Sequence, residues 1–363
     1  MLLAVTVRKA LEDRYQATGY QSIREALTAY AEAAGAVVVA LDDADDMGGY
    51  GLPAALGGEP GSLLLALRSL RQKIGPLDSL LLVGGNDIVP HCQVANPVTD
   101  RGVDGDAVVL SDNPYGTDAD TLDEYLAPPL AVGRLTDFPR GSADDFVQLL
   151  NAATASRKSR TVRSRTAAAV VNLDWSDFSR EAASPLPAPV EWYYSPGYLM
   201  NRSRRADADR EFLYFNLHGF SGVAEWQGYD SVLERFVTAV TPDAFDQEYV
   251  SGAVVFAENC YGAQTDGRTP ANCCALRLVQ EGAAFVGATG LAYGSHLAPS
   301  FFLDDADALA QGFWTGVTNG LQLGEALRQA RQQYWADSHT PPSNPFKQKT
   351  LLQFILLGDP GWN

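Results

Sequence analysis

The feature that most constrains the fold is a regular alternation between helical segments and short apolar runs rich in β-branched residues. Residues 22–34 have the spacing of an amphipathic helix and precede the strand-like run 36–41. A second helical segment, 61–74, precedes a second apolar run, 79–85, which ends on glycines. Helices that alternate with short buried strands are typical of a mostly parallel sheet covered by helices. The sequence therefore predicts an α/β fold.

The second half of the chain repeats this alternation. Four strand candidates end on Gly, Asn or another polar residue, and they lie at 166–173, 211–219, 252–260 and 283–290. A helix at 142–156 and a basic connector, 156–165, separate them from the first half. We place the boundary between two packed subdomains there, giving residues 1–160 and 161–363. A chain of 363 residues that is 46% hydrophobic is long and apolar enough for both.

Two of the predicted strand ends carry reactive side chains. His218 follows the apolar run 212–217 and precedes Gly219, and Cys260 follows the run 253–257. Because ligands of open parallel sheets bind at the carboxyl ends of the strands, we expect the imidazole and the thiol to face one crevice. Either residue alone is more often structural, a buried thiol or a turn, and their combination points to nucleophilic catalysis. The backbone N–H groups of Gly219 and Cys260 are candidate oxyanion donors.

These residues and several ordered motifs resemble the clan CD cysteine peptidases, the caspases and gingipains. The gingipain-like motifs are LLLVGGNDIVP at 80–90, SDNPYG at 111–116, LAVGRL at 130–135, FVGATG at 285–290 and LLGDP at 356–360. The resemblance covers the chain from about residue 80 to its end. It implies a caspase–gingipain-like three-layer α/β sandwich with a mostly parallel sheet. It also implies Cys260 as nucleophile, His218 as base or proton donor, an oxyanion hole that includes Gly219, and no organic cofactor.

The resemblance also suggests residues that select the substrate. Asp112 in SDNPYG matches the position expected for an acid at the base of the pocket for the residue before the cleaved bond. A buried carboxylate there would favour arginine or lysine, whereas the alternative is that Asp112 caps a turn. Tyr293 lies near the position of an aromatic pocket wall, and a core or loop tyrosine is the alternative. Glu258, just before the nucleophile, either orients the site or caps a strand turn.

Two further features leave alternatives open. Asp118, Asp120 and Asp123 crowd carboxylates into one loop, which predicts either a structural calcium site or, the preferred interpretation, a solvated acidic loop. No other metal is expected, because no second pair of ligands accompanies His91 and Cys92. His296 is a rival to His218 as the base, and His218 is preferred because its strand-end position is defined.

Composition limits the partners. The formal net charge of −17 argues against nucleic acid and anionic membranes as partners, because these require clustered Lys and Arg. No apolar run is long enough to span a membrane, and the first residues are too short an apolar run for a signal peptide. Four cysteines without C-x-x-C spacing favour a reducing compartment and a cytoplasmic location.

Together these observations predict a cysteine endopeptidase that cleaves a protein or peptide after Arg or Lys by a Cys–His dyad. Two alternatives remain: a transpeptidase of the same fold, in which an amine replaces water, and a binding or scaffold domain without turnover. Relatives of this kind can be held inactive by a pro-segment or await an activating partner. The basic stretch 157–165 is a candidate self-cleavage site.

Overall fold

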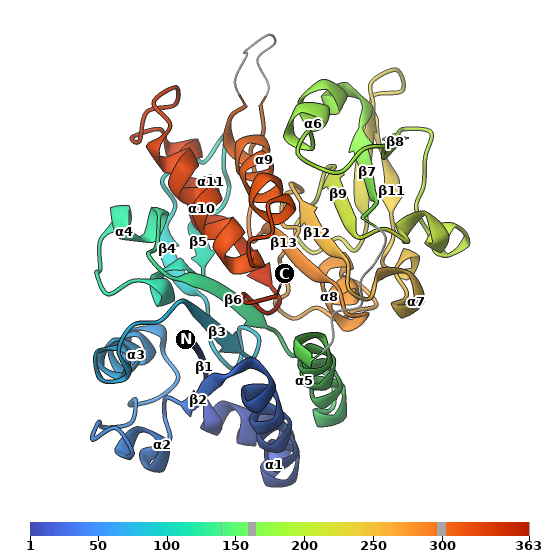
Figure 1. Ribbon diagram of the computed structural model, residues 1–363. Coiled ribbons are helices and arrows are strands. Elements are labelled where there is room, and N and C mark those ends of the chain that lie inside the picture. The colour runs from blue at the N-terminus through green and yellow to red at the C-terminus, as the bar shows by residue number, and fades with distance from the viewer. Residues whose placement is uncertain (139, 159–164, 296–302, 363) are drawn as a thin grey trace.

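The computed structural model describes residues 1–138, 140–158, 165–295 and 303–362 (Figure 1). His296 and most of the basic stretch 157–165 therefore lie outside the described residues. None of the helices within these ranges is long and apolar enough to cross a membrane.

Ten strands form one sheet in the order β2-β1-β3-β6-β14-β13-β12-β9-β7-β8. The strands, in that order, span Ala36–Ala40, Leu2–Thr6, Ser79–Val83, Ala131–Leu135, Phe354–Leu357, Ala284–Ala288, Val254–Ala257, Phe212–Asn216, Ala167–Asn172 and Val190–Ser195. Neighbouring strands are parallel within the first five and within the last five, and β14 pairs with β13 in the antiparallel sense. The predicted mostly parallel α/β sheet is thus confirmed, with one reversal of direction at its centre.

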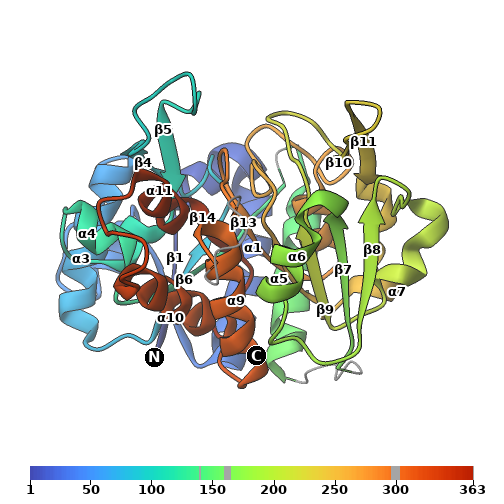
Figure 2. The same cartoon turned by 90° about the horizontal axis from the view of Figure 1, so that it is seen from above.

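Helices cover both faces of this sheet. On one face α1 (Arg8–Ala34) packs against α5 (Ala143–Lys158), and on the other α9 (Asp305–Thr318) packs against α10 (Leu323–Ala336) (Figures 1 and 2). Successive residues of a strand point to opposite faces, so Phe215 of β9 joins the cluster of the first face and Tyr214 that of the second. The strands read as continuous apolar runs because both faces are buried.

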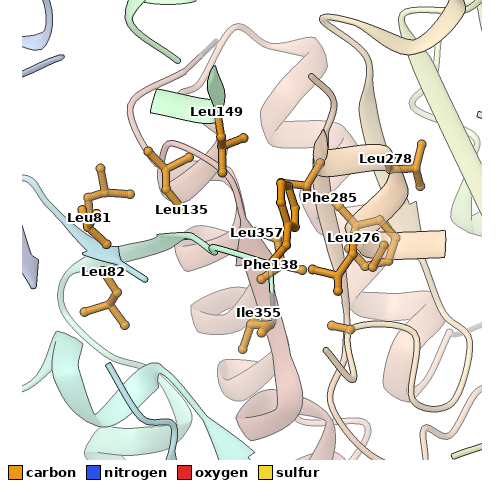
Figure 3. Packing of buried hydrophobic residues seen from close by; sticks show 14 of the residues in the cluster. Leu81, Leu82, Leu135, Phe138, Leu149, Leu276, Leu278, Phe285, Ile355 and Leu357 are labelled. Atoms are coloured by element: carbon orange, nitrogen blue, oxygen red, sulfur yellow. The ribbon is translucent and has the colours of Figure 1, made fainter. Parts of the chain in front are cut away.

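One hydrophobic cluster runs through both halves of the sheet. It joins Leu81 of β3 and Leu149 of α5 to Leu357 of β14 and Phe285 of β13 (Figure 3). Strand β14 comes from the end of the chain and lies between β6 and β13. The predicted division near residue 160 coincides with the passage of the chain from one half of the sheet to the other. The two halves nevertheless share one sheet and one core.

Two hairpins complete the fold. One is formed by β4 (Cys92–Ala95) and β5 (Val108–Ser111), the other by β10 (Trp226–Asp230) and β11 (Arg235–Val240). In Figure 2 they stand at the same rim of the molecule, one over each half of the sheet. The remaining helices that bear on the site are α3 (Pro60–Ile74), α4 (Leu122–Leu126), α8 (Cys274–Gln280) and α11 (Pro345–Gln353).

Candidate active site

The two predicted catalytic residues follow neighbouring strands. Strands β9 and β12 pair in parallel, with Phe215 opposite Ala257 at their carboxyl ends. His218 and Cys260 lie two and three residues beyond β9 and β12, so both loops leave the sheet at the same edge. A Cβ atom at Gly219 would overlap the carbonyl oxygen of Cys260, so these loops are in direct backbone contact and require glycine.

Both side chains line one cavity of about 290 Å³. Its other lining residues are Trp175, Phe178, Asn216, Leu217, Glu258, Ala292, Tyr293, Gly294, Ser295 and Asp307. The backbone N–H groups of Gly219 and Cys260 donate to no backbone carbonyl among the residues that the structure describes. A substrate carbonyl oxygen placed between them would meet two free donors, which is the chemistry of an oxyanion hole.

The thiol of Cys260 is held by the backbone of Ala292. Its Sγ lies 3.3 Å from the Ala292 nitrogen and 3.4 Å from the Ala292 oxygen. Burial raises the pKa of the Cys260 thiol, and the N–H of Ala292 offsets part of that shift. The resting nucleophile is therefore a neutral thiol that needs a base to remove its proton. The other three cysteines are free and buried, so Cys260 is the most accessible thiol.

The imidazole of His218 lies among aromatic rings. Its centroid is 4.3 Å from that of Trp175, 4.9 Å from that of Phe236 and 6.5 Å from that of Phe220. Burial lowers the pKa of His218 to about 4, and the negative charge of Asp174 opposes that shift. At neutral pH the imidazole is thus uncharged and able to accept the thiol proton.

Asp174 is a site residue that sequence reasoning missed. It follows β7, the neighbour of β9, two residues after the strand ends at Asn172. Its position just past a third strand end was the signal in the sequence, because parallel strand ends share one edge of the sheet. Its carboxylate stabilises the imidazolium that His218 becomes once it has taken a proton.

A pair of buried carboxyl groups, Glu258 and Asp307, lines the cavity beside the nucleophile. Their exposed fractions are 6% and 1%. Glu258 Oε1 accepts a hydrogen bond of 2.5 Å from the hydroxyl of Tyr214, while its Oε2 has no partner. Asp307 Oδ2 accepts the Ser295 N–H at 2.6 Å. In the described part of the chain no cation forms an ion pair with either carboxyl.

Burial raises the pKa of both carboxyl groups, while the hydrogen bond with Glu258 lowers that of Asp307. Burial is the larger cause for Glu258, and the charge of Asp307 adds to it, so its pKa lies well above the usual value. Burial raises the pKa of Asp307 to about 6. At neutral pH the pair therefore holds one proton and about one negative charge, which leaves the cavity suited to a single cationic group.

Asp112 is not in this cavity, in contrast to the prediction. Its carboxylate is buried and accepts bonds from His91 Nδ1 at 2.7 Å and from Arg134 Nε at 2.9 Å. The charge of Arg134 and of His91 lowers the pKa of Asp112 against the effect of burial. The aspartate thus pairs with the arginine of LAVGRL in the first half of the sheet. This internal ion pair leaves it no free oxygen for a substrate.

Tyr293 lines the cavity and is bound to a network of polar contacts. Its hydroxyl donates to Asp104 at 2.7 Å. Asp104 and Asp106, from the loop between β4 and β5, both bind the buried ammonium of Lys349 in α11, at 2.5 and 2.7 Å. Nothing in the sequence indicated the Lys349 ion pairs, because their members lie 243 and 245 residues apart.

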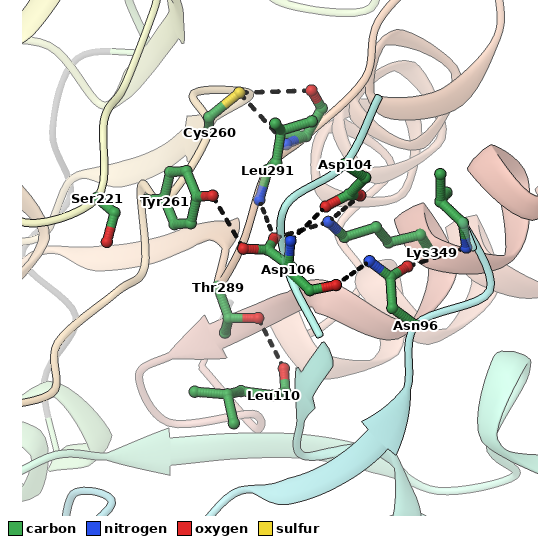
Figure 4. A network of polar contacts seen from close by, with 12 residues as sticks. Asn96, Asp104, Asp106, Leu110, Ser221, Cys260, Tyr261, Thr289, Leu291 and Lys349 are labelled. Atoms are coloured by element: carbon green, nitrogen blue, oxygen red, sulfur yellow. Dashed lines mark hydrogen bonds and ion pairs between the residues drawn. The ribbon is translucent and has the colours of Figure 1, made fainter. Parts of the chain in front are cut away.

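The same network holds the loops on both sides of the nucleophile. Asp106 Oδ1 accepts the hydroxyl of Tyr261 at 2.9 Å, and its Oδ2 accepts the N–H of Leu291 at 2.8 Å. Tyr261 follows Cys260 with a left-handed backbone, φ 56°. Leu291 precedes Ala292, whose backbone contacts the thiol. A loop of the first half therefore positions the nucleophile of the second (Figure 4).

The acidic loop near α4 has its charge balanced by arginines of α3. Asp120 pairs with Arg68 at 2.7 Å and Asp118 with Arg71 at 3.1 Å. Asp123 lies in the first turn of α4. No group of three or more His, Cys, Asp or Glu side chains that could hold a metal ion occurs among the described residues. Two of the three carboxylates that were candidate calcium ligands thus form ion pairs with arginines.

Comparisons with known proteins extend this picture. The model of peptidase family C25 matches residues 36–363. The solved complex of the pro- and mature domains of RgpB from Porphyromonas gingivalis is similar in structure, with a TM-score of 0.63 and 12% identity over 99% of this chain and 79% of that one. A structure described as a protease has a TM-score of 0.57 and 13% identity over 99% of this chain and 77% of that one. None of the curated proteins compared with the chain matches it.

Proposed function

The chain belongs to peptidase family C25, the gingipain family of cysteine-type peptidases, and we propose that it hydrolyses peptide bonds after arginine or lysine with Cys260 and His218 as its catalytic dyad. The observation that carries the proposal is the cavity that Cys260 and His218 share with the Glu258–Asp307 pair. A nucleophile, a base and a carboxyl pair that carries about one negative charge are thereby brought together from separate parts of the chain.

The reaction begins from an uncharged dyad. As the Cys260 sulfur attacks the scissile carbonyl carbon, its proton passes to the imidazole of His218. The N–H groups of Gly219 and Cys260 stabilise the oxyanion, and Asp174 stabilises the imidazolium. Collapse of the tetrahedral intermediate expels the amine, which takes the proton from His218. Water then attacks the thioester with His218 as base, which releases the carboxylic acid and restores the thiol.

The preference for a basic residue is supported by the Glu258–Asp307 pair and no longer by Asp112. Two carboxyl groups that have no counter-cation among the described residues line the cavity next to the nucleophile, and one oxygen of Glu258 is unpaired there. A guanidinium or ammonium group there would neutralise the ionised member and satisfy that oxygen. The buried, unpaired charge of the free enzyme thus becomes an ion pair in the complex.

Cleavage of a mixed peptide library, analysed by mass spectrometry, tests the proposal. The wild type is expected to cut after Arg and Lys, and Cys260→Ala is expected to leave every peptide intact while keeping the fold. Cuts after uncharged residues would refute the assigned preference, and full activity of Cys260→Ala would refute the dyad. Adding an amine acceptor to the same reactions distinguishes hydrolysis from transpeptidation, because only the latter joins the acceptor to the acyl fragment.

Control of activity by a pro-segment or a partner belongs to the same proposal. The RgpB structure that resembles the chain contains a pro-domain bound to the mature domain. Residues 157–165 carry the basic side chains that the enzyme is proposed to recognise. Incubation of the purified wild type and of Cys260→Ala, followed by intact mass measurement, tests self-cleavage there. A cut in this stretch in the wild type alone is expected, and an uncut wild type that cleaves peptides would exclude it.

A further inference from the structure

An apolar surface adjoins the imidazole of His218, outside the cavity that contains Cys260. It belongs to the β10–β11 hairpin and to the loop after β9. The hairpin is tied to the site through the backbone, because His218 and Gln227 exchange hydrogen bonds of 2.7 and 2.9 Å. The position of the hairpin is therefore fixed relative to the imidazole.

Phe220 and Phe236 form this surface. Their ring centroids are 4.8 Å apart, and that of Phe236 is 4.9 Å from the centroid of His218 in an edge-to-face arrangement. Phe236 is 47% exposed, and neither phenylalanine lines the cavity that contains Cys260 and Glu258. The imidazole thus contacts both Trp175, which lines the cavity, and Phe236 of the Phe220–Phe236 surface. A half-exposed aromatic ring packed on a catalytic group is available to a bound substrate.

The proposed reaction determines which part of the substrate lies next to the Phe220–Phe236 surface. His218 gives its proton to the leaving amine, and that nitrogen belongs to the residue after the cleaved bond. A proton donor must be within about 2.6–3.2 Å of the atom that it protonates. The Cα atom of that residue is one bond from the nitrogen, so its side chain emerges next to the rings that pack on His218.

We propose that Phe220 and Phe236 form a subsite for the side chain of the residue after the cleaved bond, and that this subsite selects apolar residues. This inference rests on the proposed function and narrows its substrates to basic–apolar peptide bonds. An apolar side chain would remove water from the exposed face of Phe236. An acidic side chain would be disfavoured, because the carboxylate of Asp174 already acts on His218 from close by.

Matched peptides that differ only after the arginine test the subsite. We expect kcat/KM for Leu or Phe at this position to exceed that for Ser or Asp by about tenfold, the effect of partly burying a few methylene-sized groups. In Phe236→Ser the Leu/Ser ratio is expected to fall to about one, whereas Phe236→Leu should keep most of it. Val232→Ser is the matched control, because Val232 is 88% exposed in the turn of the same hairpin and should leave the ratio unchanged.

A Leu/Ser ratio of about one in the folded wild type would overturn the inference, and so would an unchanged ratio in folded Phe236→Ser. The wild-type ratio decides the matter even if Phe236→Ser does not fold. Alkylation of Cys260 by N-acetyl-arginine chloromethyl ketone keeps this result separate from the proposed function, since the reagent carries no residue after the reactive carbonyl. Alkylation without a peptide preference refutes the subsite alone. If the reagent does not alkylate Cys260 and no peptide is cleaved, the dyad and the subsite are refuted together.

Discussion

At the scale of single residues, the site is built from groups held in their uncharged forms. Burial alone accounts for most of this, since it raises the pKa of Cys260 and lowers that of His218. The dyad therefore starts as thiol and imidazole, and charge appears only during attack. Among the described lining residues of the cavity, the resting charge is that of the Glu258–Asp307 pair.

The titration of Asp307 predicts how activity depends on pH. Its pKa is about 6, so acid protonates it below that pH and removes the charge that pairs with a guanidinium. We expect kcat/KM for an arginine peptide to fall as pH decreases through about 6. For the matched peptide with citrulline, an uncharged analogue of arginine, kcat/KM should stay flat until His218 titrates near 4. Parallel pH profiles for the two peptides would contradict the role of Asp307.

Replacing Asp307 should raise stability while it weakens recognition. The folded pKa of Asp307 lies above its unfolded value of 3.8, so ionisation destabilises the folded state, with the full penalty at pH above 6 and none below about 4. Asp307→Asn is expected to raise the free energy of unfolding by about 1–3 kcal/mol at pH 7 and to leave it unchanged at pH 4. Thermal unfolding at the two pH values measures this, and equal gains at both would contradict the account.

At the scale of elements, the sequence could predict those parts of the site that lie at the ends of short apolar strands. The ends of β9 and β12 could be identified because each is a short apolar run that stops at polar residues. That pattern put His218 and Cys260 at neighbouring strand ends, and the structure has them at the ends of the paired strands β9 and β12. Asp112 was misplaced because its partners, His91 and Arg134, lie 21 and 22 residues away in sequence, and only the fold brings them to it.

Other elements could not be predicted from the sequence. Strand β1 has only five residues and lies at the start of the chain. So short an apolar run shows no hydrophobic periodicity that would distinguish a strand from a coil or from the beginning of the following helix. Asp307 reaches the cavity from the first turn of α9, where acidic residues such as it and Asp305 are common in any helix, so nothing local marked it. The reversed direction of β14 depends on the path of the preceding helices, which a strand pattern does not encode.

The loop between β4 and β5 should matter for the rate through Asp106. Asp106→Ala removes the acceptor for Tyr261 and Leu291 and leaves Lys349 with one carboxylate in place of two. We expect kcat to fall about ten- to a hundredfold with a smaller change in KM, since misplacing a nucleophile by about 1 Å has that effect. Asp106→Asn keeps an acceptor and should recover part of the loss. Equal kcat in Asp106→Ala and the wild type would refute the positioning role.

At the scale of the whole molecule, the two halves are one folding unit. Strand β14 from the end of the chain pairs with both halves, and a single hydrophobic cluster extends through them. The site uses this continuity, because residues of the β4–β5 loop and of α11 hold the loops around Cys260. The division near residue 160 therefore describes the path of the chain and not two independent cores.

Separation of the halves tests this continuity. A fragment ending at residue 158 loses β14, which leaves β6 as an open edge, and it loses the helices that cover that edge. We expect it to be unfolded or aggregated, and the full chain to unfold in a single calorimetric transition. Two separate transitions, or a monomeric fragment with dispersed amide resonances, would show that the halves are independent domains.

The most direct test of the central claim is to trap the acyl-enzyme during turnover. An arginine ester acylates quickly, so acid quenching followed by intact mass measurement and peptide mapping should find one acyl group as a thioester on Cys260. His218→Ala should form it far more slowly, because the thiol proton then has no acceptor. An acyl group on any other residue, or undiminished hydrolysis by Cys260→Ala, would contradict the account.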